Sequence, residues 1–388
     1  MKIGILTQSL FQNYGGLLQN YALQQVLIRA GHAPITIDHP RRDRLADLRY
    51  FIGRGRLRFL HALFPKIYKE PAYVPSKSEM RVIAQHTQHF IDKYIVKTSS
   101  LSSHNAFRSV AESGQFGAYV AGSDQCWRPK YNISFLKEMF LCFAEGQKNV
   151  KRIAYAASFG VDFWEMDITT TAECARLAKK FDLVTVREDS GVALCKNNLG
   201  VEAVHVLDPT LLLEKEHYIR IVEQEKEPVS SGNLFYYILD PAATKSAFIS
   251  EVAVKMGLAP FTVLPKYQAE KRTRQAVKQH LEECVYPSVT SWLRAFMDAK
   301  IVIVDSFHGM VFSIIFNKPF VVIGNKGRGM SRFTSLLRLF SLEDRLLDAD
   351  HLDMRILDRP IDWAHVNKIK EEHMEVSTSL LLNALKDA

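Results

Sequence analysis

Short apolar runs alternate with amphipathic stretches from the beginning of the chain. The run KIGILT at 2–7 is continuous and rich in β-branched residues, which predicts a buried strand. At 17–30 the apolar residues recur every three or four positions, as on one face of a helix, and Gly31 suits the end of that helix. With a second strand expected at 34–39, these residues predict one strand–helix–strand unit.

The same alternation continues along the rest of the chain. Strands that run into polar turns are expected at 118–124, 152–160, 183–189 and 203–209, with helices at 76–94, 170–180 and 189–199. After a charged and then Pro/Ser/Gly-rich stretch at 222–233, further strands are expected at 234–240, 261–264, 301–304 and 319–323, with helices at 244–256, 290–299, 307–316 and from 361. This alternation is typical of parallel α/β folds. We therefore predict two Rossmann-like domains facing a cleft, at 1–225 and 226–360, and a C-terminal helix at 361–388 that packs back on the first domain.

The composition is that of an ordinary globular protein. The chain has 388 residues, of which 47% are hydrophobic and 24% charged, which is enough for two full cores. No apolar stretch approaches the roughly 20 residues of a membrane-spanning helix, and no signal-peptide pattern is present. The five cysteines are scattered and form no Cys-x-x-Cys pair, which favours reduced thiols over disulfides or a zinc site. We expect a cytoplasmic protein.

Positive charge is concentrated in one segment, 41–69, of a chain with a formal net charge of +8. Leu, Phe, Tyr and Ile residues are interleaved with its arginines and lysines, and only Asp43 and Asp47 oppose them. Such a segment suits an anionic membrane surface, and it equally suits a nucleic-acid backbone. Because no nucleic-acid-binding signature accompanies it, we favour a membrane surface or a diphosphate-bearing substrate and expect no nucleic acid; a solvated, flexible insertion is the alternative. The basic residues are Arg41, Arg42, Arg44, Arg49, Arg54, Arg56, Arg58, Lys66 and Lys69.

The most informative stretch is IVIVDSFHG at 301–309. It reads as a strand that enters a helix through a tight turn carrying Asp305, Ser306 and His308. Ligands of open α/β sheets bind at the carboxyl ends of strands, and the N-terminus of a helix there attracts anions. His308 could bind a phosphate or carboxylate, transfer a proton, or only cap its own helix.

Two further strand-to-helix turns carry polar groups. In NYGGLLQNYAL at 13–23, Asn13, Gly15 and Gly16 allow the backbone to approach a ligand closely, although a simple tight turn is the alternative. In AGSDQCW at 121–127, the side chains suit sugar hydroxyls or a helix cap. The candidate residues of this second turn are Ser123, Asp124 and Gln125.

Cations are expected at two other strand ends. Arg187, in TVREDS, is placed to grip a phosphate or carboxylate, or else to pair with a neighbouring carboxylate. The turn NKGRGMSRF at 325–333 brings Lys326, Arg328 and Arg332 together as an anion cradle. Asp208, in VLDPT, is expected to be structural.

Several site classes lack their signatures. The first loop is not GxGxxG and has no acidic residue at the usual dinucleotide position, which excludes a nicotinamide site. No GxSxG, HExxH or Walker motif occurs, so we expect no metal and no cofactor.

Taken together and in this order, these motifs resemble those of the polysaccharide pyruvyl transferase family. The resemblance runs from KIGILT and NYGGLLQNYALQ, through AGSDQCW, RIAYAASFG, TVRED and VLDPTLLL, to VDSFHGMVFSIIFNKPFVVI. It covers the chain apart from the basic segment and the C-terminal tail. The resemblance implies the fold of B-type glycosyltransferases. It also implies transfer of the pyruvyl group of phosphoenolpyruvate to two sugar hydroxyls, giving a cyclic ketal.

The resemblance also assigns residues. The family's functional histidine, which follows Arg-Leu or Ser-Phe, matches His308 after Ser306 and Phe307. Since no arginine adjoins it here, Lys326, Arg328 or Arg332 must supply that charge. The family's strand-end arginine matches Arg187. On this basis His308 is expected as the acid, the base or a phosphate ligand, and Asp124 as a base that activates a hydroxyl.

The resemblance further implies a role in capsule, exopolysaccharide or cell-wall polymer assembly. The acceptor would be a sugar or oligosaccharide linked to a lipid diphosphate, bound on the side of the first domain, with phosphoenolpyruvate on the side of the second. Segment 41–69 would then contact the inner face of the membrane. The competing interpretations are a nucleotide-sugar glycosyltransferase of the same architecture and a basic membrane- or polysaccharide-binding protein without activity.

Overall fold

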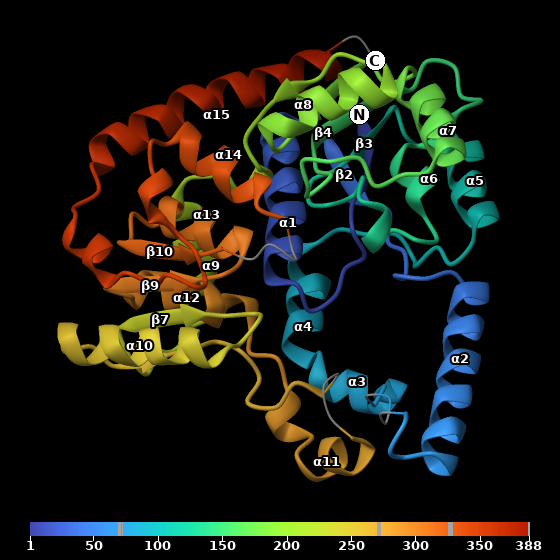
Figure 1. Ribbon diagram of the computed structural model, residues 1–388. Helices are drawn as coiled ribbons and strands as arrows, with labels where there is room; N and C mark the ends of the chain where they lie inside the picture. The colour runs from blue at the N-terminus through green and yellow to red at the C-terminus, as the bar shows by residue number, and fades with distance from the viewer. Residues whose placement is uncertain (69–70, 72, 270–272, 325–328, 387–388) are drawn as a thin grey trace.

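The computed structural model describes residues 1–386 apart from 69–70, 72, 270–272 and 325–328, and its core is two parallel β-sheets (Figure 1). Every strand pair within the sheets is parallel. The first sheet has the order β2-β1-β3-β4-β5-β6 and the second β11-β10-β9-β7-β8. The strands of the first are β1 (Lys2–Leu6), β2 (Ala33–Thr36), β3 (Ala118–Ala121), β4 (Lys151–Ala157), β5 (Leu183–Val186) and β6 (Val204–His205); those of the second are β7 (Leu234–Tyr237), β8 (Pro260–Phe261), β9 (Ile301–Val304), β10 (Phe320–Ile323) and β11 (Leu346–Leu347).

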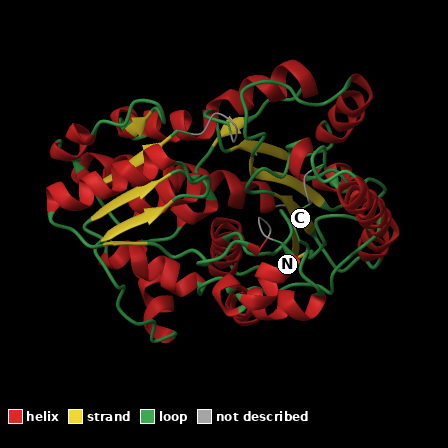
Figure 2. Cartoon of the chain, turned by 60° about the horizontal axis from the view of Figure 1, so that its bottom comes forward, coloured by secondary structure: helices red, strands yellow, loops and turns green. Residues whose placement is uncertain are grey.

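Helices lie on both sides of each sheet (Figure 2), which buries both faces of the apolar strands. The predicted fold class, two Rossmann-like α/β domains, is confirmed. Among the described residues the helices are α1 (Tyr14–Arg29), α2 (Arg44–Leu63), α3 (Lys77–Ile83), α4 (Gln85–Tyr94), α5 (His104–Glu112), α6 (Leu136–Met139), α7 (Ile168–Ala178), α8 (Asp189–Leu194), α9 (Lys215–Gln224), α10 (Ala243–Met256), α11 (Arg274–Gln279), α12 (Val289–Asp298), α13 (Phe307–Ile315), α14 (Ser331–Leu339) and α15 (Trp363–Leu385).

The structure departs from the sequence-based expectations at a few elements. The single helix expected at 76–94 is two helices that meet at Ala84. Most of the basic segment, for which a flexible insertion was the alternative, forms the 20-residue helix α2, with Asp43 accepting a hydrogen bond from the amide of Ala46 as its N-cap; Lys69 lies outside the described residues. Helix α9 ends at Gln224, inside the stretch expected to be a linker.

The two domains share packed contacts. Tyr14 of α1 lies 5.8 Å from Trp292 of α12 between ring centroids, and its hydroxyl donates to the carbonyl of Pro287 at 2.8 Å. Helix α15 returns to the first domain, where the amide of Leu207 donates to Oγ of Ser377 at 3.1 Å (Figure 1). The boundary at 225/226 falls between the last strand of one sheet and the first strand of the other, and its position stays a prediction.

Each sheet reverses its winding direction once. In the first sheet this topological switch point lies between β1 and β3, and in the second between β9 and β7. Because ligands of such folds bind beside the carboxyl ends of the strands at the switch point, the loops after these four strands are where a site is expected. No helix of the described ranges is long and apolar enough to cross a membrane.

Candidate active site

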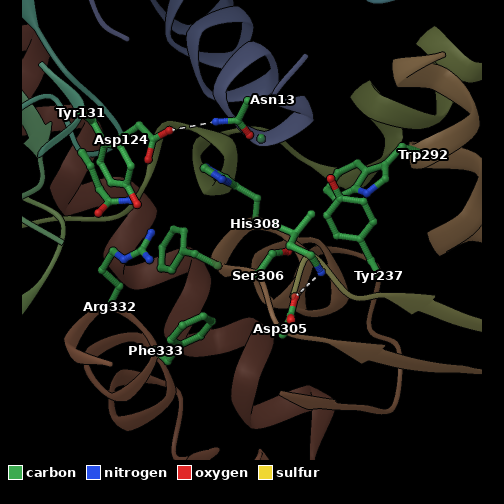
Figure 3. A pocket seen from close by; sticks show the side chains of 14 residues that line it. Asn13, Asp124, Tyr131, Tyr237, Trp292, Asp305, Ser306, His308, Arg332 and Phe333 are labelled. Carbon is green, nitrogen blue, oxygen red and sulfur yellow. Dashed lines mark hydrogen bonds between the residues drawn. The ribbon is translucent and has the colours of Figure 1, made fainter. Parts of the chain in front are cut away.

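A polar cavity of about 90 Å³ lies between the domains, at the carboxyl ends of the strands beside both switch points (Figure 3). Figure 3 shows Asp124 and Arg332 on one side of His308, and Tyr237 and Trp292 on the other. The volume exceeds what one water molecule needs and suits a small ligand. The cavity is lined by Asn13, Gly15, Asp124, Gln125, Tyr131, Tyr237, Leu239, Trp292, Asp305, Ser306, Phe307, His308, Arg332 and Phe333.

Three helices begin at this cavity. Asn13 and Ser306 are the residues before the first turns of α1 and α13, and Arg332 lies in the first turn of α14. Asn13 makes no side-chain cap hydrogen bond, and no acidic residue lies in the first turn of any of the three helices. The positive ends of three helix dipoles therefore converge on the cavity, which favours an anionic ligand.

His308 lies in the first turn of α13 and is only 8% exposed. Its Nε2 is 3.5 Å from Oδ2 of Asp208, and this nitrogen makes no hydrogen bond within the described structure. The other edge of the ring lies against Gly15 of α1, where a Cβ added to the glycine would be 2.1 Å from Nδ1. The imidazole is thus held between a buried carboxylate of the first domain and the beginning of α1.

This contact makes Gly15→Ala a specific test of the histidine's position. The new methyl group would overlap the ring, so His308 must move, and a displacement of about 1 Å at a reacting group lowers rates by about 100-fold. We expect a loss of turnover of that order, measured as the steady-state rate of the enzyme's reaction, with the fold retained.

Gly53→Ala is the matched control, because Gly53 is also in a helix and a Cβ added there would have nothing within 4 Å. Equal turnover of the Gly15→Ala and Gly53→Ala variants would show that the position of His308 against α1 does not matter for the reaction.

Arg187 is placed differently from the sequence-based expectation. It is 1% exposed and does not line the cavity. Its Nη1 donates to Oδ2 of Asp208 at 2.8 Å and its Nη2 to Oδ1 of Asp124 at 3.2 Å, while its guanidinium lies over the ring of Phe307. The geometry favours the ion-pair interpretation over direct contact with substrate, so Arg187 is a positioning residue.

Asp208 was expected from the sequence to be structural, and it also lies directly behind His308. Its Oδ1 accepts from the amide and hydroxyl of Thr210, and its Oδ2 accepts from Ser123 Oγ at 3.1 Å. Burial opposes its ionisation, but the charges of His308 and Arg187 outweigh burial and hold the pKa of Asp208 well below its ordinary value. Asp208 is therefore a fixed negative charge beside the imidazole.

Asp124 lines the cavity but is poorly suited to be a base. Its two oxygens accept from Arg187 and from Nδ2 of Asn13, the latter at 3.3 Å. Burial raises its pKa, but the charges of Arg187, His308 and Arg332 lower it below the ordinary value overall. A carboxylate held ionised in this way accepts a proton weakly, so the geometry favours a fixed negative charge over the expected hydroxyl-activating role.

Arg332 is the cation that the described structure brings to the cavity wall. It is 6% exposed, and burial together with the charge of Arg187 lowers its pKa to about 10. A bound anion would offset this burial of charge. Lys326 and Arg328, the other two expected cations, lie outside the described residues.

Asp305 and Ser306 line the cavity, but their polar groups are engaged within the protein. Asp305 accepts hydrogen bonds from the amides of Leu239 and Asp240 and from Nζ of Lys245, the last at 2.7 Å. Oγ of Ser306 accepts from the amide of Gly309 at 3.1 Å as a helix N-cap. These contacts favour positioning roles over the expected substrate contacts.

Of the remaining residues expected in the site, one lines the cavity and two lie behind the residues that line it. Gln125 lines the cavity, and its Oε1 accepts from Nη1 of Arg128 at 3.0 Å. Ser123 is fully buried and binds Asp208, and Gly16 lies against Asn13 outside the lining. These two residues support the site without reaching the cavity.

An aromatic wall was missed by the sequence reasoning. Tyr237 and Trp292 contact each other with ring centroids 5.6 Å apart, and Tyr131 and Phe333 close the opposite side. Tyr237 could have been found, because it lies within the strand predicted at 234–240, beside the second switch point. Trp292 and Tyr131 gave no signal, since a helix and a short turn bring them in from elsewhere. Within the described ranges, no group of three or more His, Cys, Asp and Glu side chains could hold a metal ion.

Solved structures share the two-domain architecture. Arabidopsis thaliana UGT89C1 complexed with UDP is 10% identical, with 99% of each chain covered and a TM-score of 0.50. UDP-GlcNAc 2-epimerase from Neisseria meningitidis bound to UDP-GlcNAc is 11% identical over 100% of both chains, with a TM-score of 0.48. MurG of Acinetobacter baumannii is 10% identical over 98% of this chain and 99% of its own, with a TM-score of 0.47. The fold expected from the resemblance, that of B-type glycosyltransferases, is confirmed.

No curated protein matches the sequence. The family model described as "Polysaccharide pyruvyl transferase" matches residues 13–327, which is most of the chain and includes the turns that carry Asn13, Asp124, Arg187 and His308. The chain belongs to the polysaccharide pyruvyl transferase family.

Proposed function

We propose that this protein transfers the pyruvyl group of phosphoenolpyruvate to two hydroxyls of a sugar, forming a cyclic ketal. The observation that carries the proposal is the meeting of three helix N-termini, Arg332 and His308 at one small cavity. Phosphoenolpyruvate bears a phosphate and a carboxylate, and these groups are what such a cluster of donors and positive charge binds.

The reaction requires one proton donor and two hydroxyl groups. His308 protonates C3 of the enol, which becomes a methyl group, and C2 gains oxocarbenium character. One sugar hydroxyl adds to C2, the C2–O bond to phosphate breaks, and the second hydroxyl closes the ring. Of the two protons that the hydroxyls release, one restores His308 and the other leaves with phosphate. The fixed charges of Asp124 and Asp208 would stabilise the positive charge that develops at C2 and on the imidazole.

The acceptor is proposed to approach over the first domain. A groove of about 680 Å³ lies beside the loop between β1 and α1, and is lined by Leu10 and Phe11 of that loop, by Met80 of α3 and by Ile91 of α4. The same loop carries Asn13 into the catalytic cavity. A sugar linked to a lipid diphosphate fits this arrangement, because the apolar part of the groove would hold lipid while the sugar reaches His308. The polymer would be a capsular, extracellular or cell-wall polysaccharide.

Segment 41–69 is proposed to contact an anionic membrane surface. On α2, Leu48, Ile52, Phe59 and Leu63 form one apolar stripe and are 57%, 63%, 64% and 55% exposed. A basic helix with an exposed apolar stripe lies in the plane of the membrane interface. Changing Leu48 and Phe59 to serine should abolish co-sedimentation with phosphatidylglycerol vesicles, whereas Ile168→Ser, at a still more exposed apolar position on α7, should not.

The test of the reaction is phosphate release from phosphoenolpyruvate with a panel of lipid-linked galactose, mannose and N-acetylhexosamine acceptors. Acceptor-dependent release, with a product heavier than the acceptor by one pyruvate less one water, would support the proposal. If no acceptor gives release, and a nucleotide sugar but not phosphoenolpyruvate raises the Tm, the proposal is wrong and the glycosyltransferase interpretation replaces it.

A further inference from the structure

A second cavity, of about 270 Å³, lies behind helix α2 and shares no lining residue with the catalytic cavity. Phe51, Arg54 and Arg58 line it from α2, at the spacing of one helical face. Tyr73 and Arg274, the first residue of α11, face them from the other side. Three guanidinium groups from two separate parts of the chain therefore surround one cavity.

These arginines have no acidic partner in the described structure. None of the three forms an ion pair among the described residues, although Arg42 near the start of the same helix pairs with Asp47. Nη1 of Arg54 donates to the hydroxyl of Tyr50 at 3.2 Å, whereas its Nη2 is buried without a hydrogen-bond partner. Like charges around a common space repel, and a bound anion removes the repulsion.

The chemistry points to a phosphate group. Guanidinium forks bind phosphate oxygens in pairs, and three of them suit a dianion better than a single carboxylate. Phe51 and the ring of the largely buried Tyr73 add apolar walls, which a free inorganic ion would not need; the hydroxyl of Tyr73 donates to Glu79, which does not line the cavity. The arginine face of α2 also adjoins its exposed apolar stripe, so a ligand with a phosphate and a hydrocarbon chain can contact both.

We propose that Arg54, Arg58 and Arg274 bind the phosphate of a lipid at the membrane surface. This inference deepens the proposed function and rests on it for its biological meaning, because a lipid-linked acceptor carries such a group. Two sources share the chemistry: the diphosphate of a lipid carrier and the phosphodiester of a bilayer lipid. The site would hold the lipid while the sugar reaches the catalytic cavity.

The test is calorimetric binding of farnesyl diphosphate to the full chain, with farnesol as the probe that lacks the anion. Arg58→Gln with Arg274→Gln should weaken binding about tenfold or more, since charge-assisted hydrogen bonds are lost. Arg56→Gln is the matched control, because Arg56 is exposed on the same helix and does not line the cavity. It should stay within about twofold of the unmodified protein.

A second arm identifies the source. Selective loss of farnesyl diphosphate binding supports a carrier diphosphate. A bilayer phosphodiester is supported if farnesyl diphosphate does not bind, and if the protein co-sediments with phosphatidylglycerol vesicles but not with phosphatidylcholine vesicles. In that case only the double variant should lose this co-sedimentation. Equal effects of the double variant and Arg56→Gln, or equal binding of farnesol, would overturn the proposal. Because these are binding measurements, they can succeed even if no pyruvyl transfer is found.

Discussion

His308→Gln is expected to lower turnover by about 10²–10⁴-fold, the range that a positioned acid or base contributes. The reason is geometric. His308 is the titratable side chain that α13 places in the cavity, with Asp208 behind it at 3.5 Å and Gly15 fixing its other edge. Glutamine keeps hydrogen-bonding capacity and approximate length but cannot carry the proton to C3. Single-turnover phosphate release with a saturating acceptor is the measurement.

The same variant separates the two roles that the sequence left open. If His308 is the proton donor, kcat falls while the KM for phosphoenolpyruvate changes little. If it is a phosphate ligand, the KM rises and kcat is largely kept. His217→Gln, at a histidine of α9 that is hydrogen-bonded to Tyr21 and does not line the cavity, serves as the control. A single-turnover rate near that of the unmodified protein would remove His308 from the mechanism altogether.

Arg187→Met is expected to destabilise the fold by about 3–5 kcal/mol, the effect of removing one partner of a buried ion pair. Asp208 is fully buried, so its carboxylate cannot replace the lost partner with bulk water, whereas Asp124 is 5% exposed and lines the cavity. Methionine fills a similar volume, which limits any contribution from a cavity. Urea denaturation would measure the loss as a lower midpoint at unchanged slope.

Arg338→Met provides a matched comparison. Arg338 donates to Asp189 at 2.8 Å, the same distance as between Arg187 and Asp208, but its side chain is 66% exposed. Exposed pairs contribute about 0–1 kcal/mol, so this variant should be nearly neutral. A loss below about 1 kcal/mol in Arg187→Met would show that the buried pair does not hold the carboxylates. Adding Asp208→Asn to Arg187→Met should recover part of the loss, because one uncompensated charge is removed.

The sequence located the site because strand ends and helix starts are local patterns. Turns after β1, β3 and β9 were each expected to carry ligand-binding groups, and Asn13, Asp124 and His308 all line the cavity. The alternation of strand and helix patterns was enough to predict the α/β fold. The resemblance to the family predicted its arrangement as in B-type glycosyltransferases.

What the sequence could not supply is the hydrogen-bond partner of each polar side chain. Arg187 was expected to meet substrate, but its partners Asp208 and Asp124 lie 21 and 63 residues away and meet it only in the folded sheet. Asp305 is close to His308 in the chain, yet strand geometry turns its carboxylate to the amides of Leu239 and Asp240. Trp292 reaches the cavity through packing of α12, which no local pattern reveals.

The segment that carries α2, α3 and α4 is an insertion between β2 and β3, two strands that flank β1 in the sheet. Its two ends are therefore held in place by the sheet of the first domain. His308 lies on α13 of the other domain, where every residue of that helix is buried. Within the insertion, α4 is packed into the main core through Phe90 and Ile91, and the carbonyl of Ile83 accepts a hydrogen bond from the amide of Tyr286, so α2 is the part that can vary most freely. Under the proposed function, exchanging α2 alone between family members should accordingly change the choice of acceptor and leave the KM for phosphoenolpyruvate unchanged.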